Sequence, residues 1–142
     1  MRPRPWLLAA GLLACEAPPA DLDEGFRVVS ASPVDGSDDA YEVTIPELRV
    51  AGVADPDRCN GASVRIDAVH DDDTVAFSVP LAVDVSEDGG KLRLVHLDPL
   101  PRGFTYAMTA RGGPEGCADV DGDDILPFRS LFTVQDADPD AR

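Results

Sequence analysis

The 142-residue sequence has few positive charges and few aromatic side chains. It contains 12 Lys and Arg residues against 27 Asp and Glu, so its formal net charge is −15, and Lys91 is its one lysine. A chain of this charge repels phosphate backbones, so we expect no nucleic-acid partner and favour cations or basic surfaces as ligands. With only 5 Phe, 2 Tyr and 1 Trp, the sequence also argues against a sugar-stacking cleft.

Motifs of the common catalytic sites are missing as well. Nothing resembles a nucleophile elbow, a phosphate-binding loop or a HExxH helix, and the two histidines, His70 and His96, are far apart in the sequence. A chain this acidic can supply two carboxylates for glycoside hydrolysis, but no spacing points to such a pair. The sequence therefore predicts a protein that is not an enzyme, and a small secreted hydrolase is the weakest alternative.

The start of the chain has the pattern of an export signal. Arg2 and Arg4 precede an apolar run far shorter than the roughly 20 residues that a membrane-spanning helix needs. The run ends in Leu12-Leu13-Ala14-Cys15, which resembles the lipobox of bacterial lipoproteins. In that family the cysteine thiol is acylated, and cleavage makes this cysteine the first residue. An ordinary secretory signal with a chance cysteine is the alternative.

The lipobox implies a division of the N-terminal region. We expect a lipoprotein signal peptide at 1–14, and an acylated Cys15 with a proline- and acid-containing tether at 15–25. The membrane would then be a partner through the N-terminal lipid. The expected location is the bacterial cell envelope, at the outer membrane or the cell surface.

The rest of the chain alternates with the period of a β-strand, and no window has a convincing helical period. Every odd position from 75 to 85 is apolar, which predicts a strand with one buried face. Pro80 cannot donate to a ladder, so we expect an edge, a bulge or a break there. Shorter strand-like segments lie at 47–50, 64–68, 91–94, 104–110 and 128–134. The pattern predicts an all-β sandwich of about seven strands.

Five segments in order resemble the bacterial Ig-like domain of the SbsA type, which occurs in S-layer and surface proteins. They are Ser32-Pro33-Val34-Asp35-Gly36, the strand leading into Ala54-Asp55-Pro56, the turn and strand at 87–94, the Pro99-Leu100-Pro101 segment that runs to Tyr106, and the closing strand at 128–134. The resemblance implies an immunoglobulin-like β-sandwich over 26–136, followed by an acidic tail at 137–142. The sequence departs from the family pattern at 51–54 and at Arg102, where the family has proline.

An Ig-like topology brings together the loops that hold the two remaining cysteines. Cys59 would precede the third strand and Cys117 the last one, and these loops meet at one end of such a sandwich. Because an exported protein meets an oxidising compartment, we expect a Cys59–Cys117 disulfide, with two free thiols as the alternative. A zinc site is disfavoured, because neither cysteine has a Cys or His at metal-finger spacing.

The resemblance also implies a role for Tyr106. In Ig-like sandwiches a tyrosine pins the corner where a strand crosses between sheets, through a hydrogen bond from its hydroxyl to backbone a few residues upstream. A half-buried aromatic without this bond is the alternative.

An acidic turn is the best candidate for a metal site. Asp119, Asp121 and Asp123 place carboxylates at alternate positions around Gly122, like the first half of a calcium loop. The full pattern needs a glycine after the third acid and a later glutamate, and both are missing. We expect no cofactor, and Ca²⁺ at these three residues is the alternative.

Together these features predict a cell-envelope lipoprotein whose Ig-like domain is a structural spacer or a protein-interaction module. Its partner would be an unidentified envelope or surface protein, and the acidic loops near Cys117 would form the contact end. A calcium-dependent or adhesive ligand-binding module is the second hypothesis.

Overall fold

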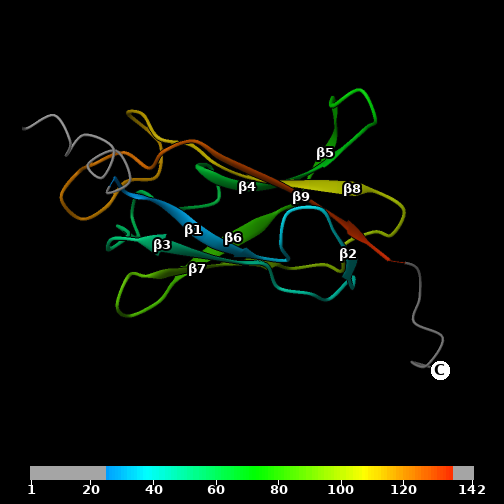
Figure 1. Cartoon of the computed structure of the whole chain (residues 1–142), viewed down its shortest axis with the longest axis horizontal. Helices are drawn as coiled ribbons and strands as arrows, with labels where there is room; N and C mark the ends of the chain where they lie inside the picture. The colour runs from blue at the N-terminus through cyan, green and yellow to red at the C-terminus, as the bar shows by residue number, and fades with distance from the viewer. Residues whose placement is uncertain (1–24, 136–142) are drawn as a thin grey trace, which may run out of the picture.

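The computed structural model describes residues 25–135. These residues form nine strands, which are arranged in two facing sheets (Figure 1). One sheet has the order β1-β3-β7-β6 and the other the order β2-β9-β8-β4-β5. The strands are β1 (Arg27–Ser32), β2 (Ser37–Ala40), β3 (Glu47–Ala51), β4 (Val64–Val69), β5 (Val75–Ser78), β6 (Leu81–Val85), β7 (Lys91–His96), β8 (Thr105–Ala110) and β9 (Phe128–Val134). The predicted all-β sandwich is confirmed.

The structure has more strands than the seven predicted, for two reasons. The alternating run at 75–85 divides at Pro80 into β5 and β6, which belong to different sheets. A chain that changes sheets must leave its ladder, and proline permits this because it has no N–H to pair. The second reason is β2, a short polar strand that lies parallel to β9 and that no apolar alternation reveals.

The core forms where the alternation turns one face of each strand inward. In β4 the side chains of Val64, Ile66 and Ala68 are fully buried, while Arg65 points outward. Each large aliphatic side chain buried in this way contributes about 1.5–3 kcal/mol relative to an exposed one. The facing sheet supplies the fully buried side chains of Leu48, Leu92 and Leu94. Period-two alternation therefore determines which residues fill the space between the sheets.

Four aromatic rings extend the core towards the edge strand β5. Tyr106 stacks on Phe132 with ring centroids 5.5 Å apart, and Phe77 meets Phe104 edge-to-face at 5.1 Å. Aromatic pairs of these geometries add about 0.5–1.5 kcal/mol beyond their buried area. The cluster fixes β5 against β8, so its outermost ring, Phe77, is held in a defined position.

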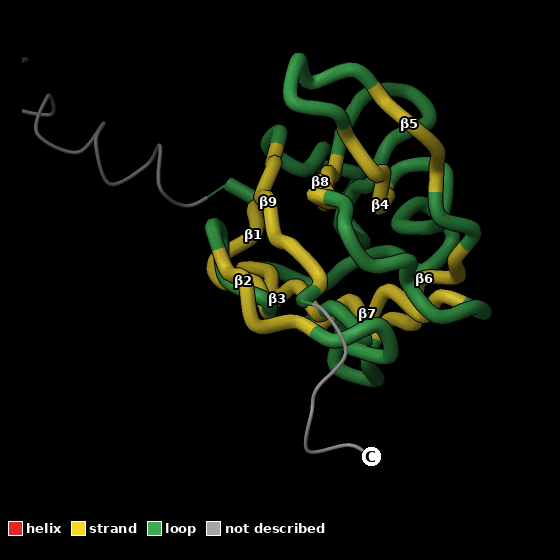
Figure 2. Tube along the Cα trace, turned by 90° about the vertical axis from the view of Figure 1, so that its right-hand side faces the viewer, coloured by secondary structure: helices red, strands yellow, loops and turns green. Residues whose placement is uncertain are grey.

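The described chain enters and leaves the sandwich at opposite ends (Figure 1). At the entry end, formed by the loops at 52–63, 86–90 and 111–127, the Phe26 carbonyl accepts a hydrogen bond from the Leu126 amide at 2.9 Å. At the exit end, formed by the segments at 33–46 and 97–104, the Gln135 amide donates to the Ala40 carbonyl at 2.9 Å. Figure 2, seen along the strands, shows β4 and β8 in one layer and β3 and β7 in the other. Within residues 25–135, no helix has the length and apolar character needed to cross a membrane.

Candidate functional site

A disulfide closes the entry end of the sandwich. Cys59 and Cys117 are bonded with an S–S distance of 2.05 Å, and both side chains are fully buried. The bond joins the loop before β4 to the loop before β9, as the sequence led us to expect. Because the two cysteines are 58 positions apart in the sequence, loop-closure entropy assigns the bond a stabilisation of about 4 kcal/mol.

Arg58 reinforces the same junction. Its guanidinium donates to the carbonyl oxygens of Gly116 at 2.9 Å and Gly113 at 2.8 Å, and lies 3.7 Å from a carboxylate oxygen of Asp124. The loop folds so tightly that a Cβ on Gly116 would lie 2.2 Å from the backbone of Gly112. Glycine is therefore required there. The disulfide and the hydrogen bonds from Arg58 both connect the loop around Cys117 to the loop before β4.

The three aspartates proposed for calcium do not form a ligand set. An oxygen of Asp119 accepts hydrogen bonds from the backbone amides of Asp121 at 3.0 Å and Asp123 at 2.8 Å, so this carboxylate stabilises its own turn. The side chains of Asp121 and Asp123 are exposed. In the described part of the chain, no group of three or more His, Cys, Asp or Glu side chains is arranged to hold a metal ion.

Tyr106 ties the exit end to the core. Its hydroxyl donates a hydrogen bond to the carbonyl oxygen of Pro101, five residues upstream, which is the corner geometry that the Ig-like resemblance implies. The side chain is fully buried. Burial raises the pKa of the Tyr106 hydroxyl to about 12, because the ionised form would lose its hydration.

His96 fixes the same segment from the other side. Its ring nitrogens lie 2.6 Å from the carbonyl oxygen of Asp98 and 2.7 Å from that of Thr44, and the residue is buried. The Leu100 amide also donates to the Glu42 carbonyl at 2.8 Å. The segment at 98–101 is therefore attached at three points, through His96, Leu100 and Tyr106.

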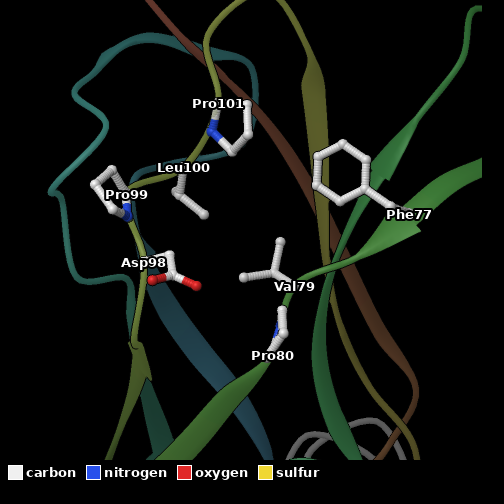
Figure 3. A pocket seen from close by; sticks show the side chains of 7 residues that line it. All are labelled: Phe77, Val79, Pro80, Asp98, Pro99, Leu100 and Pro101. Atoms are coloured by element: carbon white, nitrogen blue, oxygen red, sulfur yellow. The ribbon is translucent and has the colours of Figure 1, made fainter.

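This segment forms one wall of a pocket (Figure 3). The opposite wall is the crossover from β5 to β6, where Phe77, Val79 and Pro80 face the space. The pocket has a volume of about 190 Å³, and its lining is apolar apart from Asp98. In Figure 3 the carboxylate of Asp98 points from its wall towards Val79 on the other.

Sequence reasoning missed this pocket although it singled out the residues on both walls. Pro80 was predicted to mark an edge, a bulge or a break, and the Pro99-Leu100-Pro101 segment carried part of the family resemblance. Neither pattern indicates that the crossover and the segment after β7 face each other, because that proximity depends on the sheet order. The lipobox, Cys15, most of the tether and the acidic tail lie outside the described residues.

Comparisons with known proteins identify the fold and no family. No family model matches the chain, and no curated protein is similar enough to count as a relative. Solved structures do match, among them the bacterial S-layer protein SbsC, with 20% identity over 89% of this chain and a TM-score of 0.60. This chain spans 16% of that SbsC structure.

Two smaller proteins match over nearly their whole length. PcoC, a methionine-rich copper resistance protein from Escherichia coli, is 18% identical over 78% of this chain and 99% of its own, with a TM-score of 0.59. CopC from Methylosinus trichosporium OB3b is 20% identical over 78% of this chain and 93% of its own, with a TM-score of 0.54. At these identities the likeness is one of fold alone, that of a β-sandwich.

Proposed function

We propose that this protein is a lipid-anchored cell-envelope protein whose β-sandwich acts as a spacer and interaction module without catalysis. The observation that carries the proposal is that the described chain enters the sandwich at one end and leaves it at the other (Figure 1). A domain threaded in this way separates whatever lies at its two ends by its full length. A disulfide buried at the entry end supports folding in an oxidising compartment, as expected for an exported protein.

The lipid anchor would act at the entry end. From Cys15 to Gly25 the tether has eleven residues, which extend at most about 40 Å. The entry end carries the exposed carboxylates of Asp57, Asp121 and Asp123, and negative charge repels an anionic lipid surface. The tether would therefore hold the sandwich near the membrane, while its charge keeps the domain off the lipid.

This arrangement changes which end would meet a partner. The sequence suggested the acidic loops near Cys117 as the contact end, but those loops lie beside Phe26, where the tether joins the sandwich. An anchor at Cys15 would turn them towards the membrane. We therefore assign the partner contact to the exit end. The likeness to part of an S-layer protein supports a surface role through the fold alone.

The proposal is tested by making the full chain in a bacterial host that processes lipoproteins, beside a Cys15→Ala variant. We expect the wild-type chain in the membrane fraction, with an intact mass that matches an acylated chain beginning at Cys15 and that rises by two hydrogens on reduction. The variant should lack the lipid and leave the membrane fraction. A soluble wild-type product without lipid would contradict the anchor, and a mass unchanged by reduction would contradict the disulfide.

A further inference from the structure

We propose that the pocket beside Asp98 receives the lysine or arginine side chain of a protein partner. This inference rests on the proposed interaction role of the exit end, and it specifies the kind of side chain that the partner contributes. Three properties of the pocket carry it, namely its size and lining, its charge, and the rigidity of its walls.

The size and lining suit a single long side chain. The volume of about 190 Å³ lies below the roughly 300–1,000 Å³ of typical small-molecule pockets. Lysine and arginine bury their methylene stems against apolar surface while the charged group stays near water or a counter-ion. Val79, Pro80, Leu100 and Pro101 offer such a surface, and Phe77 adds an aromatic ring to it.

The charge of the pocket selects a cation over a neutral side chain. Asp98 is exposed and points into the space, and in residues 25–135 its carboxylate has no hydrogen bond or ion pair. The neighbouring basic residue, Arg102, lies 3.8 Å from a carboxylate oxygen of Glu42 instead. With a formal charge of −15, the whole chain attracts a basic partner and opposes a second copy of itself.

The walls are held in place before any ligand arrives. Backbone oxygens of Asp98 and Pro101 are hydrogen-bonded to His96 and Tyr106, and prolines fix the backbone on both sides of the pocket. On the opposite wall, the Val79 amide donates to the Ile66 carbonyl at 2.9 Å. A preformed pocket needs little ordering on binding, so even one side chain gains affinity from it.

The test is an NMR titration of the full chain in an uncharged detergent with Nα-acetyl-lysine amide as the probe. Nα-acetyl-norleucine amide, which has a similar stem but no charge, is the matched control. We expect saturable shifts of the Phe77, Val79 and Leu100 amides with the lysine probe, and at least about fivefold weaker binding of norleucine, as loss of a charge-assisted contact implies. Asp98→Asn should weaken lysine binding to the norleucine level, while Asp121→Asn at the entry end should leave it unchanged.

Three results would overturn the inference. Equal affinity for the lysine and norleucine probes would show that the pocket does not select a cation. Lysine binding that is unchanged by Asp98→Asn would show that Asp98 does not contact the ligand. Shifts spread over all acidic loops and weakened equally by Asp121→Asn would indicate non-specific attraction. The titration does not depend on acylation, so a negative titration would not contradict the lipid anchor. In the same way, a negative mass experiment would not contradict a positive titration.

Discussion

The two ends of the sandwich are stabilised by different kinds of bond. The entry end is closed by the Cys59–Cys117 disulfide, with Arg58 bridging the same loops. The described segments of the exit end have no covalent link. They are joined by the hydrogen bond from the Tyr106 hydroxyl to the Pro101 carbonyl and by the buried ring of His96, whose nitrogens lie 2.6 Å and 2.7 Å from two backbone carbonyl oxygens. Both ends are closed, but only one of them depends on the redox state of its surroundings.

The difference suggests that the two ends of the domain have different roles. A disulfide suits the end at which the described chain enters the sandwich, because a bonded pair of loops stays closed when local hydrogen bonds open. The exit end instead carries a preformed apolar pocket beside the exposed carboxylate of Asp98, and its hydrogen bonds hold the pocket wall in position. In the account proposed here, the entry end bears the attachment and the exit end meets the partner.

Removing the Cys59–Cys117 disulfide should have the largest effect on the free energy of unfolding. We expect the double variant Cys59→Ala/Cys117→Ala to lose about 4 kcal/mol of unfolding free energy, because the unfolded chain regains the freedom of a long loop. Denaturant unfolding measures the loss, with Cys15→Ala as the control because it removes a cysteine outside the sandwich. A loss below about 1 kcal/mol would show that packing and Arg58 close the entry end without the disulfide.

At the exit end, Tyr106→Phe removes the corner hydrogen bond and keeps the ring. The Pro101 carbonyl then lacks its donor, so we expect a loss of about 1–2 kcal/mol in the same unfolding measurement. If the variant is as stable as the wild type, the hydroxyl does not hold the pocket wall.

The same residue gives the protein a pH dependence at alkaline pH. Because burial raises the pKa of Tyr106 to about 12 from its ordinary 10.0, the unfolded chain ionises first as the pH rises. The stabilisation is complete below pH 10 and is lost progressively between pH 10 and 12. Thermal unfolding across this range should show a decline in melting temperature that is smaller in Tyr106→Phe. An equal decline in both proteins would assign it to other groups.

The acidic turn of the entry end should be a smaller contributor. Asp119→Ala removes the oxygen that accepts two backbone amides, and we expect a loss of about 1 kcal/mol. Asp121→Ala, at an exposed carboxylate in the same turn, is the control and should change stability by less than about 0.5 kcal/mol. Equal effects of the two substitutions would mean that the turn responds to charge and not to the Asp119 hydrogen bonds.

The smallest effect is expected at the pocket carboxylate. Asp98→Asn should change the unfolding free energy by less than about 0.5 kcal/mol, because the segment is held by the backbone oxygen of Asp98 and not by its side chain. This variant separates binding from folding. A large destabilisation would make Asp98 a structural residue and would weaken its assignment as a ligand contact.

Alternation and chain-breaking residues predicted much of this fold. The inward rows of β4, β7 and β8 follow directly from period-two patterning, and Pro80 predicted the break between β5 and β6. The pattern did not predict β2, because its polar residues owe their strand conformation to pairing with β9. Tertiary contact overrides local sequence in such a short segment.

The candidate site was less predictable than the fold. Cys59, Cys117 and Tyr106 were identified because their chemistry is recognisable in an Ig-like context. The pocket depends on which strands lie side by side, and Asp98 is one acid among 27 acidic residues. The position of His96 was also not predictable, because its two carbonyl contacts emerge only from the folded arrangement of Thr44 and Asp98.

The most direct test of the account measures which end of the sandwich lies nearer to the membrane. A fluorescent amino acid is placed at exposed Val120 of the entry end or at exposed Leu97 of the exit end, and energy transfer to labelled lipid headgroups is measured in vesicles carrying the acylated chain. If the entry end faces the membrane, energy transfer is stronger from position 120 than from position 97. Equal transfer from both positions, or stronger transfer from position 97, would contradict the proposal that the entry end faces the membrane and the pocket faces a partner.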